Sequence, residues 1–154
     1  MADTNRTSLG SVHVSGGKGH HRCRLLGTLV PGHRSRLSRA SRYRLELAAP
    51  DIGTRSTDAA DVFECLCQLR ARFDLQGIRL CCNGARLNVW PSGMARDMGG
   101  GLKAYVLEVG RRASIDDLVD IFDSASIEDV ATVEDQRLFA EKWLAAPKID
   151  RPKK

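Results

Sequence analysis

Histidine is missing from most of this chain of 154 residues, because all four histidines lie within residues 1–42. Residues 43–154 therefore hold no Ser-His-Asp triad, no Cys-His pair and no His-ligated zinc site. Long apolar runs are missing too, since none approaches the ~18 residues that a membrane-spanning helix needs. These absences argue against histidine-based catalysis and against a membrane partner.

The common cofactor motifs are also missing. The run Gly99-Gly100-Gly101 lacks the Gly-x4-Gly-Lys-Ser/Thr spacing of a phosphate loop, and a strand is expected after it instead of a helix. The acidic residues within 116–129 lack the Asp-x-Asp-x-Asp-Gly spacing of a calcium loop. No Gly-x-Ser-x-Gly sequence occurs, so the serine nucleophile of that motif is missing as well. We expect no cofactor and no metal site.

The chain has five cysteines, an odd number, and no secretion signal precedes them. This favours a reduced, cytoplasmic protein. Cys65 and Cys67 lie two apart on an expected helix, whereas Cys81 and Cys82 are neighbours on an expected strand. The members of each pair therefore point apart, and we expect all four to act as small apolar fillers of the core.

Basic charge is concentrated at the two ends of the chain. The net charge is +5, yet residues 1–42 hold eight Lys and Arg against one acid, whereas residues 43–146 hold 12 basic and 17 acidic residues, a net of −5. Residues 147–154 form a second basic tail. An acidic body does not attract phosphate backbones at long range, so nucleic-acid binding would depend on the N-terminal tail alone.

Residues 1–42 are rich in Gly, Ser, His and Arg and lack apolar periodicity, which predicts a disordered tail. One apolar stretch, 25–30, has the composition of a short strand. The segment also resembles an upstream coding frame, with a later start codon at Val30 or Leu37. An organelle transit peptide, a nucleic-acid-binding arm and a plain flexible tail are the alternatives. The single folded domain is expected over 43–146.

Apolar spacing predicts how this domain begins. Alternating apolar residues from Tyr43 predict a half-buried strand. A stripe at helical spacing then predicts a helix that is capped by Thr57 or Asp58, runs to about Leu75 and stops at Gly77. The stripe consists of Val62, Leu66, Leu69 and Phe73.

The strongest local signal is Asn83-Gly84 between two alternating apolar runs, 78–82 and 85–90. It predicts a β-hairpin with a type I′ turn, because both central residues of that turn need positive φ. A loop over 91–101, with one helical turn from 93 to 98, leads to a further strand over 102–109.

Two helices are expected after these strands. Ser114 and Asp117 have the spacing of a capping box, with Ile115, Leu118, Val119 and Phe122 as the apolar stripe behind it. The opposite face carries Asp116, Asp120 and Asp123, either as a solvated surface or as a docking surface for a basic protein. The last helix starts near Thr132, has Phe139, Ala140, Trp143 and Leu144 on its apolar face, and ends at Pro147. The order β-α-β-β-β-α-α predicts an α+β domain, with a small, mostly antiparallel four-stranded sheet and helices on one face.

Specialised residues are densest between 83 and 105. The candidate site consists of Arg86, Asn88, Trp90, Ser92, Arg96, Asp97, Lys103 and Tyr105. If the strands over 85–90 and 102–109 pair, their side chains form a cationic and aromatic patch, suited to a carboxylate, a phosphate or acidic side chains of a partner. The three consecutive glycines support a site, because they lower the stability of the fold and have no side chains that could pack in compensation. A purely structural role stays open, since the exposed face of an antiparallel sheet is polar in any case.

The most distinctive string begins with Asn83-Gly84-Ala85-Arg86, continues through Trp90-Pro91-Ser92-Gly93-Met94-Ala95-Arg96-Asp97-Met98-Gly99-Gly100-Gly101 and ends with Ala104-Tyr105. It resembles a family of small uncharacterised bacterial proteins, over about 43–146. The resemblance implies a bacterial origin. It implies no activity, and no catalytic residue is carried over from it.

Three functional hypotheses follow. The first is a non-enzymatic protein-interaction module, of the immunity or accessory type, that binds a protein partner. The second is binding or catalysis of a small anionic ligand, with Arg86 and Lys103 as anion contacts, Trp90 and Tyr105 as walls and Asp97 as a base. The third is nucleic-acid binding by the N-terminal tail. The second hypothesis is favoured if the fold forms a concave site that encloses Arg86, Asn88, Arg96 and Lys103. A flat patch would favour the protein partner.

Overall fold

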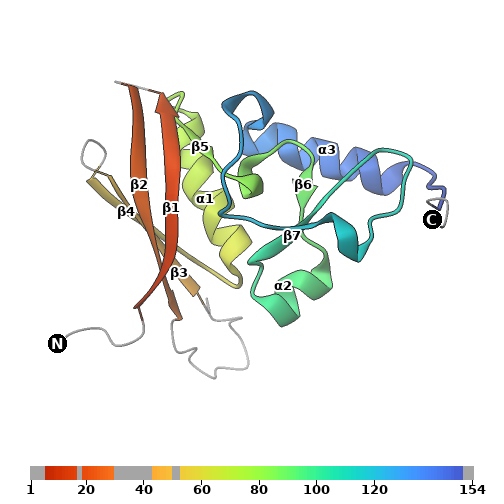
Figure 1. Ribbon diagram of the computed structural model, residues 1–154, viewed down its shortest axis with the longest axis horizontal. Helices are drawn as coiled ribbons and strands as arrows, with labels where there is room; N and C mark the ends of the chain where they lie inside the picture. Colours follow the sequence, from red (N-terminus) through yellow and green to blue (C-terminus); the bar gives the residue numbers. More distant parts are fainter. Residues whose placement is uncertain (1–5, 17–18, 30–42, 50–52, 151–154) are drawn as a thin grey trace.

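The computed structural model describes residues 6–16, 19–29, 43–49 and 53–150. The chain is α+β, as the sequence predicts, with helices packed against antiparallel sheets (Figure 1). The expected single four-stranded sheet and its strand order are not confirmed, because the described strands divide into a sheet of five and a sheet of three. Helix α1 (Val62–Asp74) lies between the larger sheet and the rest of the fold.

The larger sheet has the order β4-β3-β2-β1-β5, and every neighbouring pair is antiparallel. Its strands are β1 (Arg6–Gly16), β2 (Gly19–Leu29), β3 (Tyr43–Ala49), β4 (Gly53–Ala59) and β5 (Arg79–Cys81). The alternation from Tyr43 is confirmed by β3, in which Leu45 and Leu47 are fully buried. Part of the run 78–82 is likewise confirmed as the edge strand β5.

Strands β1 and β2 belong to the segment for which the sequence predicts disorder. β1 pairs with both β2 and β5, and β2 pairs with β3 through the apolar stretch that begins at Leu25. Such pairing uses backbone hydrogen bonds and needs little apolar periodicity, which is why the pattern of side chains does not reveal it. Val14 is the buried anchor of β1. The remainder of the predicted tail, including Val30 and Leu37, lies outside the described residues.

The predicted start of α1 is wrong by several residues. Thr57 and Asp58 belong to β4, and the helix is capped instead by Asp61, whose carboxylate accepts a hydrogen bond of 2.8 Å from the Glu64 amide. Thr57 is buried because its hydroxyl donates to the Cys65 carbonyl at 2.7 Å. β4 is a polar edge strand, so it carries none of the apolar alternation that predicts a strand. The helix ends close to the expected place, with Gly77 at positive φ just beyond it.

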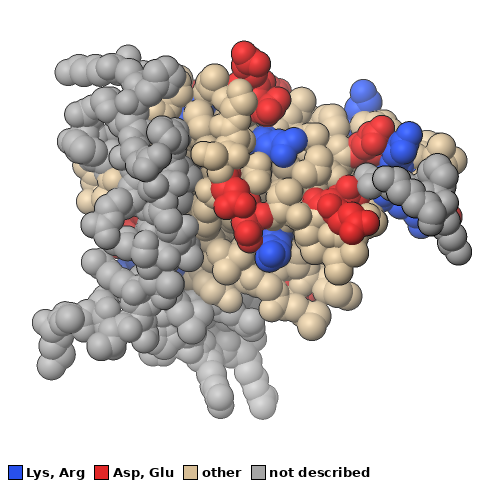
Figure 2. All heavy atoms as spheres, in the orientation of Figure 1, with Lys and Arg blue, Asp and Glu red and all other residues tan. Residues whose placement is uncertain are grey.

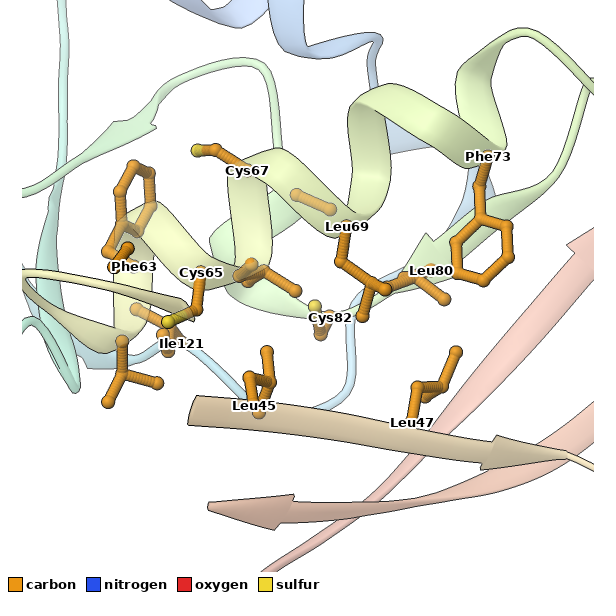
Figure 3. Packing of buried hydrophobic residues seen from close by; sticks show 14 of the residues in the cluster. Leu45, Leu47, Phe63, Cys65, Cys67, Leu69, Phe73, Leu80, Cys82 and Ile121 are labelled. Atoms are coloured by element: carbon orange, nitrogen blue, oxygen red, sulfur yellow. The ribbon is translucent and has the colours of Figure 1, made fainter. Parts of the chain in front are cut away.

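The core forms where α1 packs on the larger sheet. Figure 3 shows Phe63, Leu69 and Phe73 of α1 above Leu45 and Leu47 of β3. All five side chains are at most 2% exposed. Buried side chains occur nearly all round α1, so the helix is central and not merely amphipathic.

Four cysteines belong to this core, as predicted. Cys65, Cys67, Cys81 and Cys82 are buried and free. Burial raises the pKa of Cys65 to about 11, that of Cys67 to about 12 and that of Cys82 to about 11. These thiols therefore stay neutral near pH 7 and pack as small apolar groups. The fifth, Cys23, lies in β2, where side chains are outside the described part.

The predicted hairpin at Asn83-Gly84 is wrong. Residues Asn83–Ala85 form the short 3-10 helix η1, and neither Asn83 nor Gly84 has positive φ. Gly84 is required for another reason, since a Cβ there would meet Leu66 Cδ2 at 2.7 Å and Ile121 Cβ at 3.0 Å. Close packing, and not turn geometry, explains this glycine.

The smaller sheet has the order β6-β7-β8, with β6 (Val89–Trp90), β7 (Lys103–Val106) and β8 (Leu118–Asp120). The capping box of Ser114 and Asp117 is confirmed, but it opens only the 3-10 helix η2 (Ile115–Asp117). The expected helix behind it is wrong because residues 118–120 pair with β7 as a strand. The acidic helix face of Asp116, Asp120 and Asp123 therefore does not form. A further 3-10 turn, η3 (Ile127–Asp129), precedes the last helix.

Two further helices agree with the sequence. The expected turn after Ser92 is α2 (Gly93–Gly99), where the Ser92 hydroxyl caps the Ala95 amide at 3.0 Å. The last helix is α3 (Val133–Ala145), capped by Thr132 through the Asp135 amide. Figure 1 places α2 at one end of the smaller sheet and α3 along its side. None of the helices among the described residues is long and apolar enough to cross a membrane.

Candidate functional site

The predicted patch is only partly assembled. β6 and β7 pair as expected, and the pairing sets Trp90 directly opposite Tyr105. Arg86 and Asn88 lie before β6 and are not part of that strand. Arg86 instead makes a β-bridge with Val130, and its Nε is buried without a hydrogen-bond partner.

Arg96 has a structural position. Its Nη1 lies 3.1 Å from a carboxylate oxygen of the buried Asp61. Its guanidinium carbon lies 5.1 Å from the ring centroid of Phe63 and 5.5 Å from that of Trp90. Phe63 and Trp90 meet edge to face, with centroids 5.2 Å apart. Arg96 thus joins α2 to the start of α1 through an ion pair and a cation–π contact with Phe63, and to β6 through a cation–π contact with Trp90.

Packing explains two of the three consecutive glycines, Gly100 and Gly101, contrary to the expectation that this run lowers stability without gaining packing contacts. Gly100 ends α2 in the left-handed region, and its carbonyl accepts a hydrogen bond of 2.8 Å from the Val62 amide. A Cβ at Gly100 would meet the Tyr43 hydroxyl at 2.8 Å, and one at Gly101 would meet Asp61 Oδ1 at 2.7 Å. The glycines let this loop approach the first turn of α1, so they no longer support a ligand site.

The other predicted residues lie at the surface. Lys103 pairs with Asp120 of the neighbouring strand at 3.6 Å, and both side chains are exposed. Asp97 is exposed on α2, and Asn88 is half-buried, with its carbonyl accepting from the Leu107 amide. The structure therefore does not bring the whole predicted set together.

A cleft of about 750 Å³ opens beside Trp90 and Tyr105. We call it the aromatic cleft. One wall is the loop that leads into α2, another is β7 with the segment after it, and the third is α3 with the residue Lys148 beyond its end. It is lined by Trp90, Pro91, Ser92, Gly93, Tyr105, Leu107, Arg112, Ala113, Arg137, Ala140, Glu141, Trp143, Leu144 and Lys148.

The aromatic cleft concentrates the rarest side chains of the protein. Aromatic residues make up 5% of the sequence, yet both of its tryptophans and one of its two tyrosines line this cleft. Trp90, Tyr105 and Trp143 are only half-buried, and Leu144 beside them is 71% exposed. Tryptophan and tyrosine are the side chains that most often carry binding energy at interfaces.

The three basic residues of the aromatic cleft, Arg112, Arg137 and Lys148, already have partners. Arg112 pairs with Asp150 at 2.8 Å and Arg137 pairs with Glu134, and all four of these side chains are exposed. Lys148 donates to the carbonyls of Leu144 and Ala146, and its Nζ lies 4.4 Å from the Trp143 ring centroid. The Trp143 indole donates to the Arg111 carbonyl at 3.0 Å, which fixes the ring.

The wall formed by α3 is held by a buried polar network. Gln136 is fully buried, and its amide nitrogen lies within 2.9 Å of the carbonyls of Gly84, Arg86 and Val89. Arg70 donates to Gln136 and also to the carbonyls of Gly84, Ala85 and Ala131. Burial lowers the pKa of Arg70 from its usual value. The network joins α1, η1, β6 and α3, and so fixes the side of the cleft opposite β7.

Of the residues that line this cleft, the sequence predicted only Trp90, Ser92 and Tyr105 as site residues. It placed Trp143 and Leu144 on the apolar face of the last helix and therefore treated them as core. The available signal was the rarity of tryptophan, because the chain has only two tryptophans and only Trp90 was included in the predicted site. Arg112, Arg137, Glu141 and Lys148 carry no motif and become visible only through the fold.

No group of three or more His, Cys, Asp or Glu residues among the described side chains is placed to hold a metal ion. Figure 2 shows clusters of acidic side chains with single basic side chains between them over the described part of one face. No protein-family model matches the chain, and no curated protein matches its sequence.

Proposed function

We propose that this protein is a non-enzymatic protein-interaction module, of the immunity or accessory type, and that the aromatic cleft binds its protein partner. The observation that carries the proposal is the meeting of Trp90, Tyr105 and Trp143 with the exposed Leu144 in one cleft. Exposed apolar and aromatic groups that gather in this way are typical of binding sites.

The proposal favours a protein partner over a small anionic ligand. The two anion contacts expected for such a ligand, Arg86 and Lys103, do not line the aromatic cleft. The candidate base Asp97 does not line it either. The cleft instead combines aromatic and apolar side chains with the exposed charged side chains of Arg112 and Arg137, a mixture that is common in protein interfaces.

A cytoplasmic location is part of the same proposal. The four described cysteines are reduced and buried in the core, which suits a reducing compartment. A bacterial host, as the resemblance implies, is the natural source of the lysate for a test.

The test is affinity capture from such a lysate with the full chain as bait. The informative variant is Leu144→Glu, which places a charge in the aromatic cleft at a position exposed enough to accept it. The matched control is Leu75→Glu, which makes the same change at a leucine that is 90% exposed and outside the cleft. Retained proteins and small molecules are identified by mass spectrometry.

A stoichiometric protein that Leu75→Glu retains and Leu144→Glu loses supports the proposal. A bait that carries a small metabolite and no protein, with the metabolite lost in Leu144→Glu, contradicts it and favours the ligand hypothesis.

A further inference from the structure

The residues of α3 that line the aromatic cleft form one stripe. Arg137, Ala140, Glu141 and Leu144 follow each other at helical spacing. Arg137 and Leu144 are seven positions apart, which corresponds to about 10 Å along the helix axis. An extended peptide advances about 3.3 Å per residue, so about three of its residues would lie along this stripe. The cleft is therefore long enough for a short extended segment.

Basic side chains stand at both ends of this stripe. Arg137 lies at its N-terminal end and Lys148 lies beyond its C-terminal end, whereas Arg112 comes from the opposite wall. Along α3, the lining residues Ala140, Trp143 and Leu144 lie between Arg137 and Lys148. The lining thus holds three basic residues and one acid. Arg112 and Arg137 belong to the body (43–146), whose net charge is −5, and Lys148 lies just beyond it.

The present ion pairs of these basic residues do not block a partner. Arg112 pairs with Asp150 and Arg137 with Glu134, and each of these side chains is more than half exposed. Exposed pairs of this kind contribute little free energy, so a carboxylate of a partner can replace them or join them. The Glu141 carboxylate can accept a hydrogen bond from a backbone amide of a bound peptide. An extended peptide needs such acceptors, because its amides have no partners within the peptide.

From this charge complementarity we infer that the aromatic cleft binds an extended acidic peptide segment of the partner. About three apolar or aromatic residues of the segment lie against Trp90, Tyr105 and Leu144. A carboxylate side chain on either flank lies near Arg137 or Lys148. This inference rests on the proposed function, because it names the chemistry of the partner at the same cleft.

The test uses a display library of random heptapeptides, selected on the full chain and counter-selected on the Leu144→Glu variant. Defined probes follow, namely fluorescein-labelled Gly-Glu-Leu-Phe-Leu-Asp-Gly and the basic counterpart Gly-Lys-Leu-Phe-Leu-Lys-Gly. Affinity is measured by fluorescence anisotropy at low and high salt. The charge variant is Arg137→Gln/Lys148→Gln, and the matched control is Arg55→Gln/Lys142→Gln, with Lys142 exposed on the same helix but outside the cleft.

We expect selected peptides to combine apolar centres with acidic flanks. We also expect Arg137→Gln/Lys148→Gln to weaken binding of the acidic probe about tenfold, while the control changes it less than about twofold. High salt should also weaken binding of the acidic probe, because salt screens the interaction between the charges. Equal binding of the basic probe, or no difference between the two double variants, overturns the inference.

The outcomes separate this inference from the proposed function. Peptides that depend on Leu144 but carry neutral or basic flanks overturn the acidic segment and leave the interaction module standing. A library that yields no peptide dependent on Leu144 overturns the inference, and only the lysate capture then decides whether a folded partner surface uses the cleft.

Discussion

Arg70 and Gln136 meet inside the protein, where Arg70 Nη1 donates a hydrogen bond of 2.6 Å to the Gln136 side-chain oxygen. Arg70 is 2% exposed and Gln136 is fully buried. The guanidinium also donates to the backbone carbonyls of Gly84, Ala85 and Ala131, so its charge is dispersed over oriented dipoles. The pair links α1 to α3, and the aromatic cleft depends on that link for its third wall.

This relationship predicts a large loss of stability for Gln136→Leu. The substitution keeps the side-chain volume. It removes the side-chain oxygen that accepts from Arg70 and the amide nitrogen that donates to three backbone carbonyls. We expect the free energy of unfolding to fall by about 3 kcal/mol, because buried polar groups that lose a hydrogen-bond partner are costly. Urea denaturation followed by tryptophan fluorescence measures it. As a control, Arg137→Gln at the neighbouring exposed position should change the free energy of unfolding by less than about 0.5 kcal/mol. A loss below about 1 kcal/mol for Gln136→Leu would show that the network is dispensable.

Gly84 gives a second prediction. An alanine Cβ there would lie 2.7 Å from Leu66 Cδ2, 3.0 Å from Ile121 Cβ and 3.2 Å from the Ile121 carbonyl oxygen. We expect Gly84→Ala to cost about 2 kcal/mol, the usual cost of overpacking. Gly93→Ala is the control, since its Cβ would meet nothing within 4 Å. Equal stability of the two variants in chemical denaturation would contradict the packing role.

Much of the fold follows from local patterns. The alternation of Tyr43, Leu45 and Leu47 and the helical stripe that ends at Phe73 are read correctly because their period matches the element that they form. The start of the last helix at Thr132 is predicted correctly because the hydrogen bond that caps it, from the Asp135 amide to the Thr132 hydroxyl, is local.

The errors arise where long-range contacts decide. Residues 118–120 have a helical stripe but become β8, since β7 offers a free edge with hydrogen-bonding groups. Asn83-Gly84 has the sequence of a hairpin turn but packs against Leu66 and Ile121. The aromatic cleft needs Trp90 and Trp143, 53 positions apart in the printed sequence, and no local rule joins them.

Arg96 and Asp61 give a third prediction. Arg96→Met keeps the side-chain length and leaves the buried Asp61 carboxylate without its cation. We expect a loss of about 2 kcal/mol and a coupling energy above about 1 kcal/mol in a double-mutant cycle with Asp61→Asn. Tryptophan emission should also shift, because Arg96 lies over the Trp90 ring. The exposed pair of Arg44 and Asp58, also hydrogen-bonded, is the comparison, and its cycle should give less than about 1 kcal/mol. A cycle for Arg96 and Asp61 no larger than this one would contradict the buried ion pair.

The buried thiols predict how stability depends on pH. Burial raises the pKa of Cys65 and Cys82 to about 11 and that of Cys67 to about 12, against 9.0 for an exposed thiol. The folded state therefore favours the neutral thiol, and its contribution is complete below pH 9 and is lost as pH rises from about 9 towards 11 and 12. We expect the free energy of unfolding to fall over this window. A variant with Cys65→Ala, Cys67→Ala and Cys82→Ala should show a smaller fall, measured by urea denaturation at each pH.

The same burial predicts slow chemistry at these thiols. At pH 8 an aromatic disulfide reagent should modify Cys65, Cys67 and Cys82 only as the protein unfolds, because the reagent needs an accessible thiolate. Cys23→Ser removes the cysteine whose side chain lies outside the described part, so that the remaining signal comes from the core. Reaction of this variant should be slow in buffer and fast in urea. One equivalent of rapid reaction in buffer can come from Cys81, which at 7% exposure is the least buried of the four cysteines. Rapid reaction of more than one equivalent would contradict the packing of α1.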